Sequence, residues 1–128
     1  ALGQQVQSNL FNLGSFLACE PEHWESYKLT PLNKDLITET EKLIDKLDSK
    51  IPKLKNFILP GGSLVSSYTH VARTVCRRVE RKLVEFKYSD QQIPENSLEF
   101  LNRLSDFLFV MARYCNLESG VEEIIWTN

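Results

Sequence analysis

Four segments of the chain place apolar residues at the three- and four-residue intervals of an amphipathic helix. The first covers residues 1–18, and its expected core face consists of Leu2, Val6, Leu10, Leu13 and Leu17. The second predicts a helix over 36–51, which Pro52 ends because proline lacks the amide hydrogen that a helix interior needs. Residues 19–31, with a proline near each end, break the period and predict a loop.

The third segment predicts a helix over about 64–87, with Ser63 as its N-cap. Its expected core face consists of Val71, Val75, Val79 and Leu83. The fourth helix is expected to start at Asn96, which resembles a capping box with Glu99. Its expected core face consists of Leu101, Leu104, Leu108, Met111 and Cys115. Without a convincing β-hairpin pattern, the sequence predicts a single all-α domain over 1–128, an up-and-down bundle of ferritin-like type with four to five helices.

The composition narrows the class of protein. The chain has 128 residues, 42% hydrophobic and 25% charged, which is typical of a folded globular domain. Its net charge of −2 argues against general nucleic-acid binding, and no apolar run has the roughly 18 residues of a membrane helix. The three cysteines lack CxxC spacing and the two histidines lie outside HExxH or ExxH motifs, which disfavours a disulfide framework, a zinc site and a di-iron site. We expect a reducing compartment.

Basic residues are concentrated on the third predicted helix, where residues 70–87 hold six basic and two acidic side chains. At helical spacing, the arginine stripe consists of Arg73, Arg77, Arg78 and Arg81, with Glu80 among them. Guanidinium groups bind phosphate oxygens bidentately, so a polyphosphate is one candidate ligand, with Glu80 holding an arginine or meeting a metal. The alternatives are a solvated face with intrahelical ion pairs and a helix that contacts DNA.

A second mixed face lies on the fourth predicted helix. Asn102, Asp106 and Arg113 share one side of it with the aromatic Phe109. Polar groups beside aromatic surface are typical of a ligand pocket or an interface. A salt-bridged contact between helices or subunits remains an alternative.

Two loops contain the remaining candidates. Phe57 lies between Pro52 and Pro60, where it either plugs the end of the bundle or presses against a flat ligand. The following Pro-Gly-Gly-Ser turn lacks the lysine of a P-loop. His70 is expected to be packed or hydrogen-bonded rather than catalytic. At the C-terminal end, residues 124–126 are apolar and are expected to dock on the bundle or to meet a partner.

Three blocks together, FILPGGS, HVARTVCRRVERK and LNRLSDFLFVMARY, resemble the PduO-type ATP:cob(I)alamin adenosyltransferases over about residues 3–115. The resemblance implies a helical bundle that forms a homotrimer with active sites between subunits. It implies transfer of the 5′-deoxyadenosyl group of ATP to the cobalt of cob(I)alamin, with release of triphosphate and with Mg²⁺ as cofactor. It also implies a reductase or a cobalamin-dependent acceptor enzyme as a partner, in the bacterial cytoplasm or, in a eukaryote, the mitochondrion.

The resemblance also implies roles for individual residues. The ATP-contacting positions it indicates are Arg77, Arg78, Glu80, Arg81 and Asn102. The cobalamin-facing positions are Phe57 and Phe109, together with Arg73, which matches an arginine at the subunit interface. Arg77, Phe57 and Asp106 are the residues assigned to catalysis, and metal ligands are not assigned.

One departure from the family is visible in the sequence. The family has a glycine- and lysine-containing segment (TGDKG-like) near its N-terminus, followed by another helix, and neither matches this sequence. We expect the chain to be truncated at its N-terminus relative to the family, with the first family helix absent. Two other functions therefore stay open, a non-catalytic cobalamin- or nucleotide-binding protein on the same scaffold and a structural bundle whose arginine stripe joins subunits.

Overall fold

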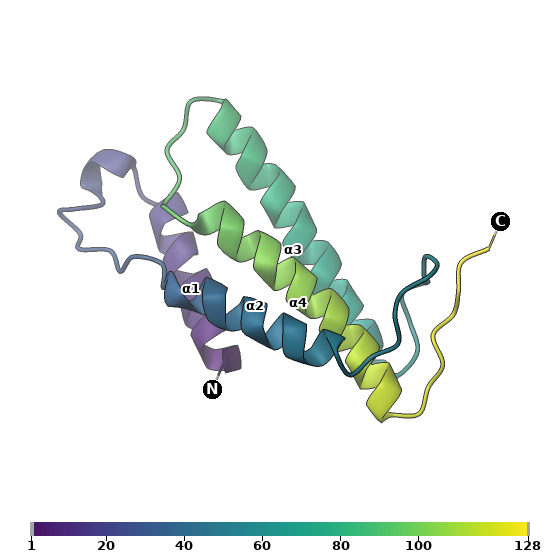
Figure 1. The fold of residues 1–128 in the computed structure, drawn as a ribbon. Helices are drawn as coiled ribbons and strands as arrows, with labels where there is room; N and C mark the ends of the chain where they lie inside the picture. Colours follow the sequence, from purple (N-terminus) through teal and green to yellow (C-terminus); the bar gives the residue numbers. More distant parts are fainter. Residues whose placement is uncertain (1, 128) are drawn as a thin grey trace.

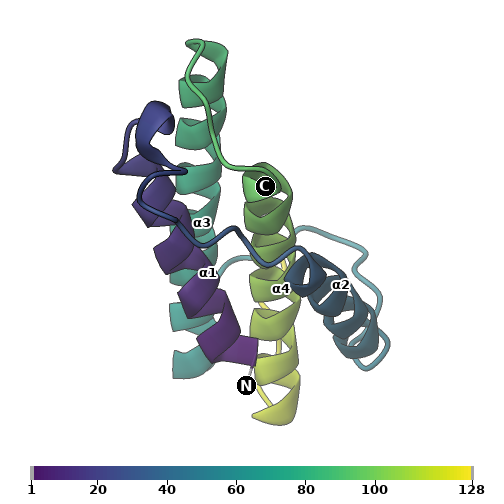
Figure 2. The ribbon, with the colours of Figure 1, turned by 90° about the vertical axis from the view of Figure 1, so that its left-hand side faces the viewer.

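The computed structural model describes residues 2–127, which fold into helices joined by loops (Figure 1). The α-helices are α1 (Leu2–Leu17), α2 (Asp35–Asp48), α3 (Leu64–Tyr88) and α4 (Ser97–Glu118), with one 3₁₀ turn, η1 (Pro21–His23). Helices α3 and α4 run antiparallel, α2 packs on the other side of α4, and α1 lies along α3 and α4 (Figure 2). The described residues therefore confirm the prediction of an all-α bundle.

The two long helices begin where the sequence predicts, although by different means. The Ser63 hydroxyl accepts a hydrogen bond from the Ser66 N–H at 3.1 Å, which confirms Ser63 as the N-cap of α3. The capping box predicted for α4 is wrong. Asn96 has a left-handed backbone (φ 67°) and makes no side-chain cap, because a capping residue needs an extended backbone. The Ser97 hydroxyl donates instead to the Pro94 carbonyl at 2.6 Å.

The core lies where α1, α2, α3 and α4 meet. Its buried side chains are Leu13, Leu32, Leu36, Ile37, Cys76, Leu83, Phe100, Leu101 and Leu104. Burial of each large aliphatic side chain stabilises the fold by about 1.5–3 kcal/mol relative to its exposure. A second, smaller cluster joins the ends of α2 and α4 through Leu47, Ile51 and Val110. The remaining predicted core positions of α4, Leu108, Met111 and Cys115, are half-buried.

The predicted core face of α1 is rotated in the structure. Leu13 is buried, but Leu10 and Leu17 are exposed, and Asn9 and Phe16 are buried in their place. The burial of Asn9 is compensated in part: its amide oxygen accepts a hydrogen bond from the Asn33 N–H at 2.7 Å, while its Nδ2 atom has no hydrogen-bond partner within residues 2–127. Phe16 is covered by the Trp24 ring, whose centroid lies 5.0 Å from its own.

The predicted core face of α3 is also wrong in part. Helix α3 carries two apolar faces, and α4 covers the one that contains Cys76 and Leu83. The other face is exposed among residues 2–127. We call it the α3 apolar stripe; it consists of Leu64, Tyr68, Val71, Val75 and Val79. Within residues 2–127, no helix is both long and apolar enough to span a membrane.

Candidate functional site

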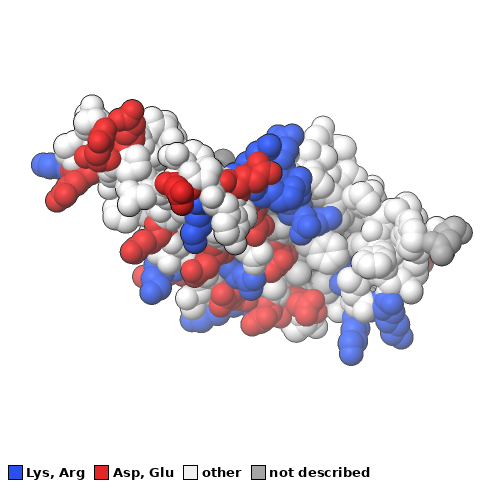
Figure 3. All heavy atoms as spheres, turned by 90° about the horizontal axis from the view of Figure 1, so that it is seen from above, with Lys and Arg blue, Asp and Glu red and all other residues white. Residues whose placement is uncertain are grey.

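The arginines of α3 lie on its exposed side. Arg77, Arg78 and Arg81 are exposed, and none of the ion pairs formed among residues 2–127 involves them. In Figure 3, basic side chains gather near the middle of the view, with largely uncharged surface between them and the end that contains the C-terminus. Of the intrahelical ion pairs considered as an alternative, none forms at the arginines within residues 2–127, although Lys82 pairs with Glu85 on the same helix. These guanidinium groups are therefore free to bind an anion.

The carboxylate within the stripe turns towards α4. Asn102 Nδ2 donates to Glu80 Oε2 at 3.2 Å. The Asn102 amide oxygen in turn accepts from the Arg103 guanidinium, and Arg103 pairs with Asp106 at 3.3 Å. Arg103 is not among the predicted site residues, although its three-residue spacing to Asp106 is the signal of such a pair. Glu80 and Asn102 line one hollow of about 350 Å³ between α2, α3 and α4.

Arg73 and Phe109 meet at the contact of α3 with α4. The guanidinium carbon of Arg73 lies 5.3 Å from the centroid of the Phe109 ring, which is a cation–π geometry. Burial and the nearby Arg77 lower the pKa of Arg73, and its Nε atom is buried without a hydrogen-bond partner within residues 2–127. Arg73 thus lies against an aromatic ring, whereas Arg77, Arg78 and Arg81 are exposed.

His70 packs beside the same ring, with its centroid 6.3 Å from that of Phe109. The side chain is buried, and neither ring nitrogen has a hydrogen-bond partner within residues 2–127. Burial, with Arg73 as the second cause, lowers the pKa of His70 and so favours the neutral imidazole. This placement confirms that His70 is a packed residue.

Phe57 is 79% exposed, so the alternative that it plugs the end of the bundle is wrong. It lies in the loop between α2 and α3, where its ring meets Trp126 edge-on with the centroids 6.3 Å apart. The two rings line an open groove of about 600 Å³ together with Leu54, Lys55 and Asn56. An exposed aromatic ring beside a groove is the arrangement expected of a ligand contact.

The predicted site residues fall into separate hollows. Glu80 and Asn102 share one, Asp106 and Phe109 line a second of about 600 Å³ between α2 and α4, and Phe57 lines a third. Among residues 2–127, no hollow described above contains both Phe57 and an arginine of the stripe. The structure therefore brings together Glu80 with Asn102 and Arg73 with Phe109, and leaves Phe57 apart from both.

Known proteins resemble this chain in sequence. A sequence model of a protein family described as cobalamin adenosyltransferase matches residues 2–115. The chain belongs to this family. The corrinoid adenosyltransferase of Bacillus subtilis is 42% identical over 119 residues, which is 93% of this chain and 59% of the relative. The human corrinoid adenosyltransferase is 41% identical over 125 residues, which is 96% of this chain and 50% of the relative.

Solved structures of the cobalamin adenosyltransferase family agree in fold. A variant of the PduO-type ATP:corrinoid adenosyltransferase from Lactobacillus reuteri, complexed with cobalamin and ATP, matches 98% of this chain and 68% of its own, with a TM-score of 0.88 and 34% identity. A second variant of that enzyme, complexed with ATP, matches with a TM-score of 0.85. The chain spans 50–59% of the length of the two curated relatives described above. The resemblance found in the three sequence blocks is confirmed, and the roles of individual residues stay predictions.

Proposed function

We propose that the protein transfers the 5′-deoxyadenosyl group of ATP to the cobalt of cob(I)alamin and releases triphosphate. The observation that carries this proposal is the set of exposed, unpaired guanidinium groups of Arg77, Arg78 and Arg81, which lies beside the Glu80–Asn102 contact. Membership of the cobalamin adenosyltransferase family supports the identity of both substrates. So does the Lactobacillus reuteri relative, whose structure contains cobalamin and ATP.

The proposed reaction does not require the protein to transfer a proton. Cob(I)alamin is itself a strong nucleophile, so its cobalt attacks C5′ of ATP without a general base, and the C5′–O bond to triphosphate breaks. The protein has to hold C5′ in line with the cobalt and to stabilise negative charge on the leaving triphosphate. The arginine stripe supplies fixed positive charge for the second task. We assign the phosphate contacts to Arg77, Arg78 and Arg81, and the orientation of the Asn102 amide to Glu80.

We propose that ATP binds together with Mg²⁺. This ion is usually held in proteins by one or two carboxylates together with substrate phosphates. Glu80 fits this role because Asn102 binds its Oε2 atom and leaves Oε1 free within residues 2–127. Asp106, which pairs with Arg103 on an exposed part of α4, is proposed to act near the same phosphates.

Phe57 and Phe109 are proposed to face the corrin. An aromatic wall against its lower face excludes water as a cobalt ligand, which favours a four-coordinate cobalt that is easier to reduce. Binding a flat ligand against Phe57 would also bury a side chain that is exposed in the free protein, and such burial contributes about 1.5–3 kcal/mol.

We further propose a homotrimer with active sites between subunits. Two observations support it. The α3 apolar stripe is uncovered among residues 2–127, and Phe57 lies in a different hollow from Glu80 and Asn102. A neighbouring copy would bury the apolar stripe and bring the two halves of the site together. Arg73 would then lie at the interface. A reductase that supplies cob(I)alamin, or an enzyme that accepts the product, would be a further partner, and the free cysteines suit a reducing compartment such as the bacterial cytoplasm or the mitochondrion.

The proposal is tested in an anaerobic assay with chemically reduced cobalamin, ATP and Mg²⁺, following the corrinoid absorbance. We expect conversion to light-sensitive adenosylcobalamin. Calorimetric titration of ATP and of cobalamin accompanies the assay. Binding of cobalamin without conversion would favour the non-catalytic binding protein, and binding of neither ligand would favour the structural bundle.

A further inference from the structure

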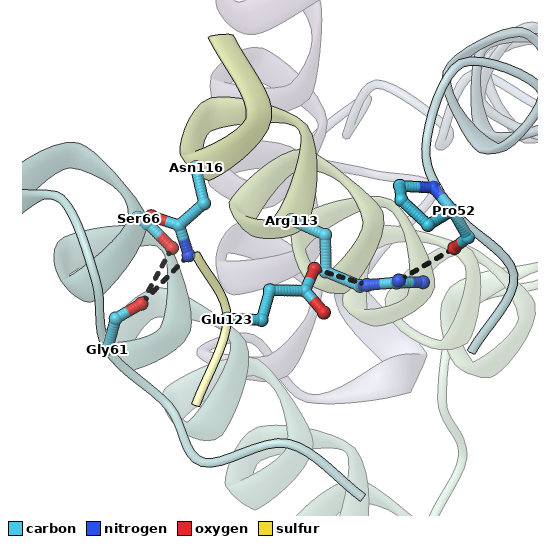
Figure 4. Close-up of polar contacts among 6 residues, drawn as sticks. All are labelled: Pro52, Gly61, Ser66, Arg113, Asn116 and Glu123. Carbon is cyan, nitrogen blue, oxygen red and sulfur yellow. Dashed lines mark hydrogen bonds and ion pairs between the residues drawn. The ribbon is translucent and has the colours of Figure 1, made fainter. Parts of the chain in front are cut away.

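The loop that carries Phe57 is held at both ends by the last turns of α4. At its start, Arg113 Nη2 donates to the Pro52 carbonyl at 2.8 Å. At its end, the Asn116 amide donates to the Gly61 carbonyl at 3.0 Å and accepts from the Ser63 N–H at 2.8 Å. Figure 4 shows the contacts of Arg113 with Pro52 and of Asn116 with Gly61, together with the hydrogen bond from Ser66 to Gly61. Arg113 is 5% and Asn116 2% exposed, so the loop ends are tied to buried groups.

The middle of the loop is held by the segment that follows α4, residues 119–126, which we call the tail. The Leu59 N–H donates to the Ile124 carbonyl at 2.7 Å, and the Trp126 N–H donates to the Phe57 carbonyl at 2.8 Å. Between them, Ile58 and Ile125 form an antiparallel bridge. The loop and the tail thus lie side by side as a short two-stranded ribbon beyond the helices (Figure 1).

One ion pair attaches this ribbon to the bundle. Arg113 Nε lies 2.7 Å from Glu123 Oε1, and the Glu123 side chain is 23% exposed. The same guanidinium therefore binds the start of the loop and the tail at once (Figure 4). Buried ion pairs add little net stability compared with apolar groups of the same size, and their best-attested use is to fix a geometry.

The Phe57 ring cannot fix its own position, because it is exposed and its aromatic neighbour, Trp126, belongs to the tail. Its backbone carbonyl is bound by the Trp126 amide. Anything that releases the tail therefore releases the backbone of Phe57. The ion pair at Glu123 is the one charged contact that the tail makes with the bundle within residues 2–127.

We propose that Arg113 and Glu123 are positioning residues, which hold the tail and the loop as one unit and so fix the ring of Phe57. The consequence for catalysis rests on the proposed adenosyl transfer. The physical part of the proposal, that the ion pair holds the ribbon together, does not depend on any substrate. The two parts therefore need separate measurements.

The first measurement is amide hydrogen exchange on the substrate-free protein, resolved at Leu59 and Trp126, for Glu123→Ala and Glu123→Gln. Glu123 is changed rather than Arg113 because it lies on the tail, whereas loss of Arg113 from the interior threatens folding. We expect exchange at both amides to become about tenfold faster, while the Ser63 amide, bound by Asn116, stays protected. The matched control is Glu85→Gln, which removes the exposed Lys82–Glu85 pair on α3. Unchanged exchange at Leu59 and Trp126 would overturn the proposal.

The second measurement is kinetic. In the Glu123→Ala protein we expect kcat for adenosyl transfer to fall about tenfold with the KM for ATP unchanged, and Glu123→Asp to restore part of kcat. A kcat that is unchanged although the two amides exchange faster would overturn the positioning role. If the unmodified protein forms no adenosylcobalamin, adenosyl transfer fails as the function, and the exchange data alone then decide whether the ion pair holds the ribbon.

Discussion

Replacement of Arg77 by alanine separates a role in binding from a role in folding. Arg77 is exposed and takes part in none of the ion pairs within residues 2–127, so its removal breaks no ion pair of the folded protein. Alanine also has a helix propensity at least as favourable as arginine. We therefore expect the free energy of unfolding to change by less than about 0.5 kcal/mol.

The expected loss lies in the use of ATP. A hydrogen bond to a charged group contributes about 1.5–3 kcal/mol, and one lost phosphate contact therefore lowers kcat/KM by about 13- to 160-fold. The assay is anaerobic adenosyl transfer at varied ATP, run beside thermal unfolding of the same samples. Lys82→Ala is the matched control on the same helix, since Lys82 pairs with Glu85 on the surface.

Normal kcat/KM in Arg77→Ala would remove this arginine from the phosphate site. An equal loss of kcat/KM in Lys82→Ala would show that the effect reflects net charge rather than a specific contact.

Three further changes test other parts of the structure. Gly62→Ala should lower the free energy of unfolding by about 1–3 kcal/mol in urea titration, because Gly62 has φ +106° and a Cβ there would overlap the Asn116 amide. Gly14→Ala is the control and should not lower the free energy of unfolding, because a Cβ at Gly14 would lie in open space. Val75→Glu on the α3 apolar stripe should convert a trimer into monomers in light scattering without unfolding the helices; a trimer that persists would place the interface elsewhere. Burial, and to a lesser extent Glu80, raises the pKa of Cys76 from 9.0 to about 11, so the thiol stays protonated in the folded protein while it ionises in the unfolded chain. The free energy of unfolding should therefore fall by up to about 2–3 kcal/mol as the pH rises from 9 to 11. An equally steep fall in the Cys76→Ala variant, which lacks the thiol, would contradict this.

The helices were predictable because their signals are local. Apolar spacing located all four, and Ser63 and Pro52 marked ends that the structure respects to within a few residues. The same periodicity could not tell which apolar face of α3 meets α4, because Val75 and Cys76 are equally apolar in sequence. It failed for Asn9 of α1 because the compensating hydrogen bond comes from Asn33, far along the chain.

The site was predictable in its residues more than in its arrangement. Residue type, together with the resemblance of three blocks to one family, identified the arginine stripe. The same two signals identified Phe57. The pair of Arg113 with Glu123 carried no signal, because an arginine at the end of a helix and an acid in an aperiodic tail meet only once the chain has turned back at Gly120. The pairing of the tail with the Phe57 loop also carried no sequence signal, since it joins backbone groups that are far apart in sequence.

The most direct test of the proposed function is the stoichiometry of products in a single anaerobic turnover. Reduced cobalamin, ATP and Mg²⁺ are mixed with the protein, and adenosylcobalamin and inorganic triphosphate are quantified separately. Adenosyl transfer predicts one triphosphate for each light-sensitive adenosylcobalamin, and no ADP or AMP. Cleavage of ATP without adenosylcobalamin, or binding of both ligands without either product, would contradict it.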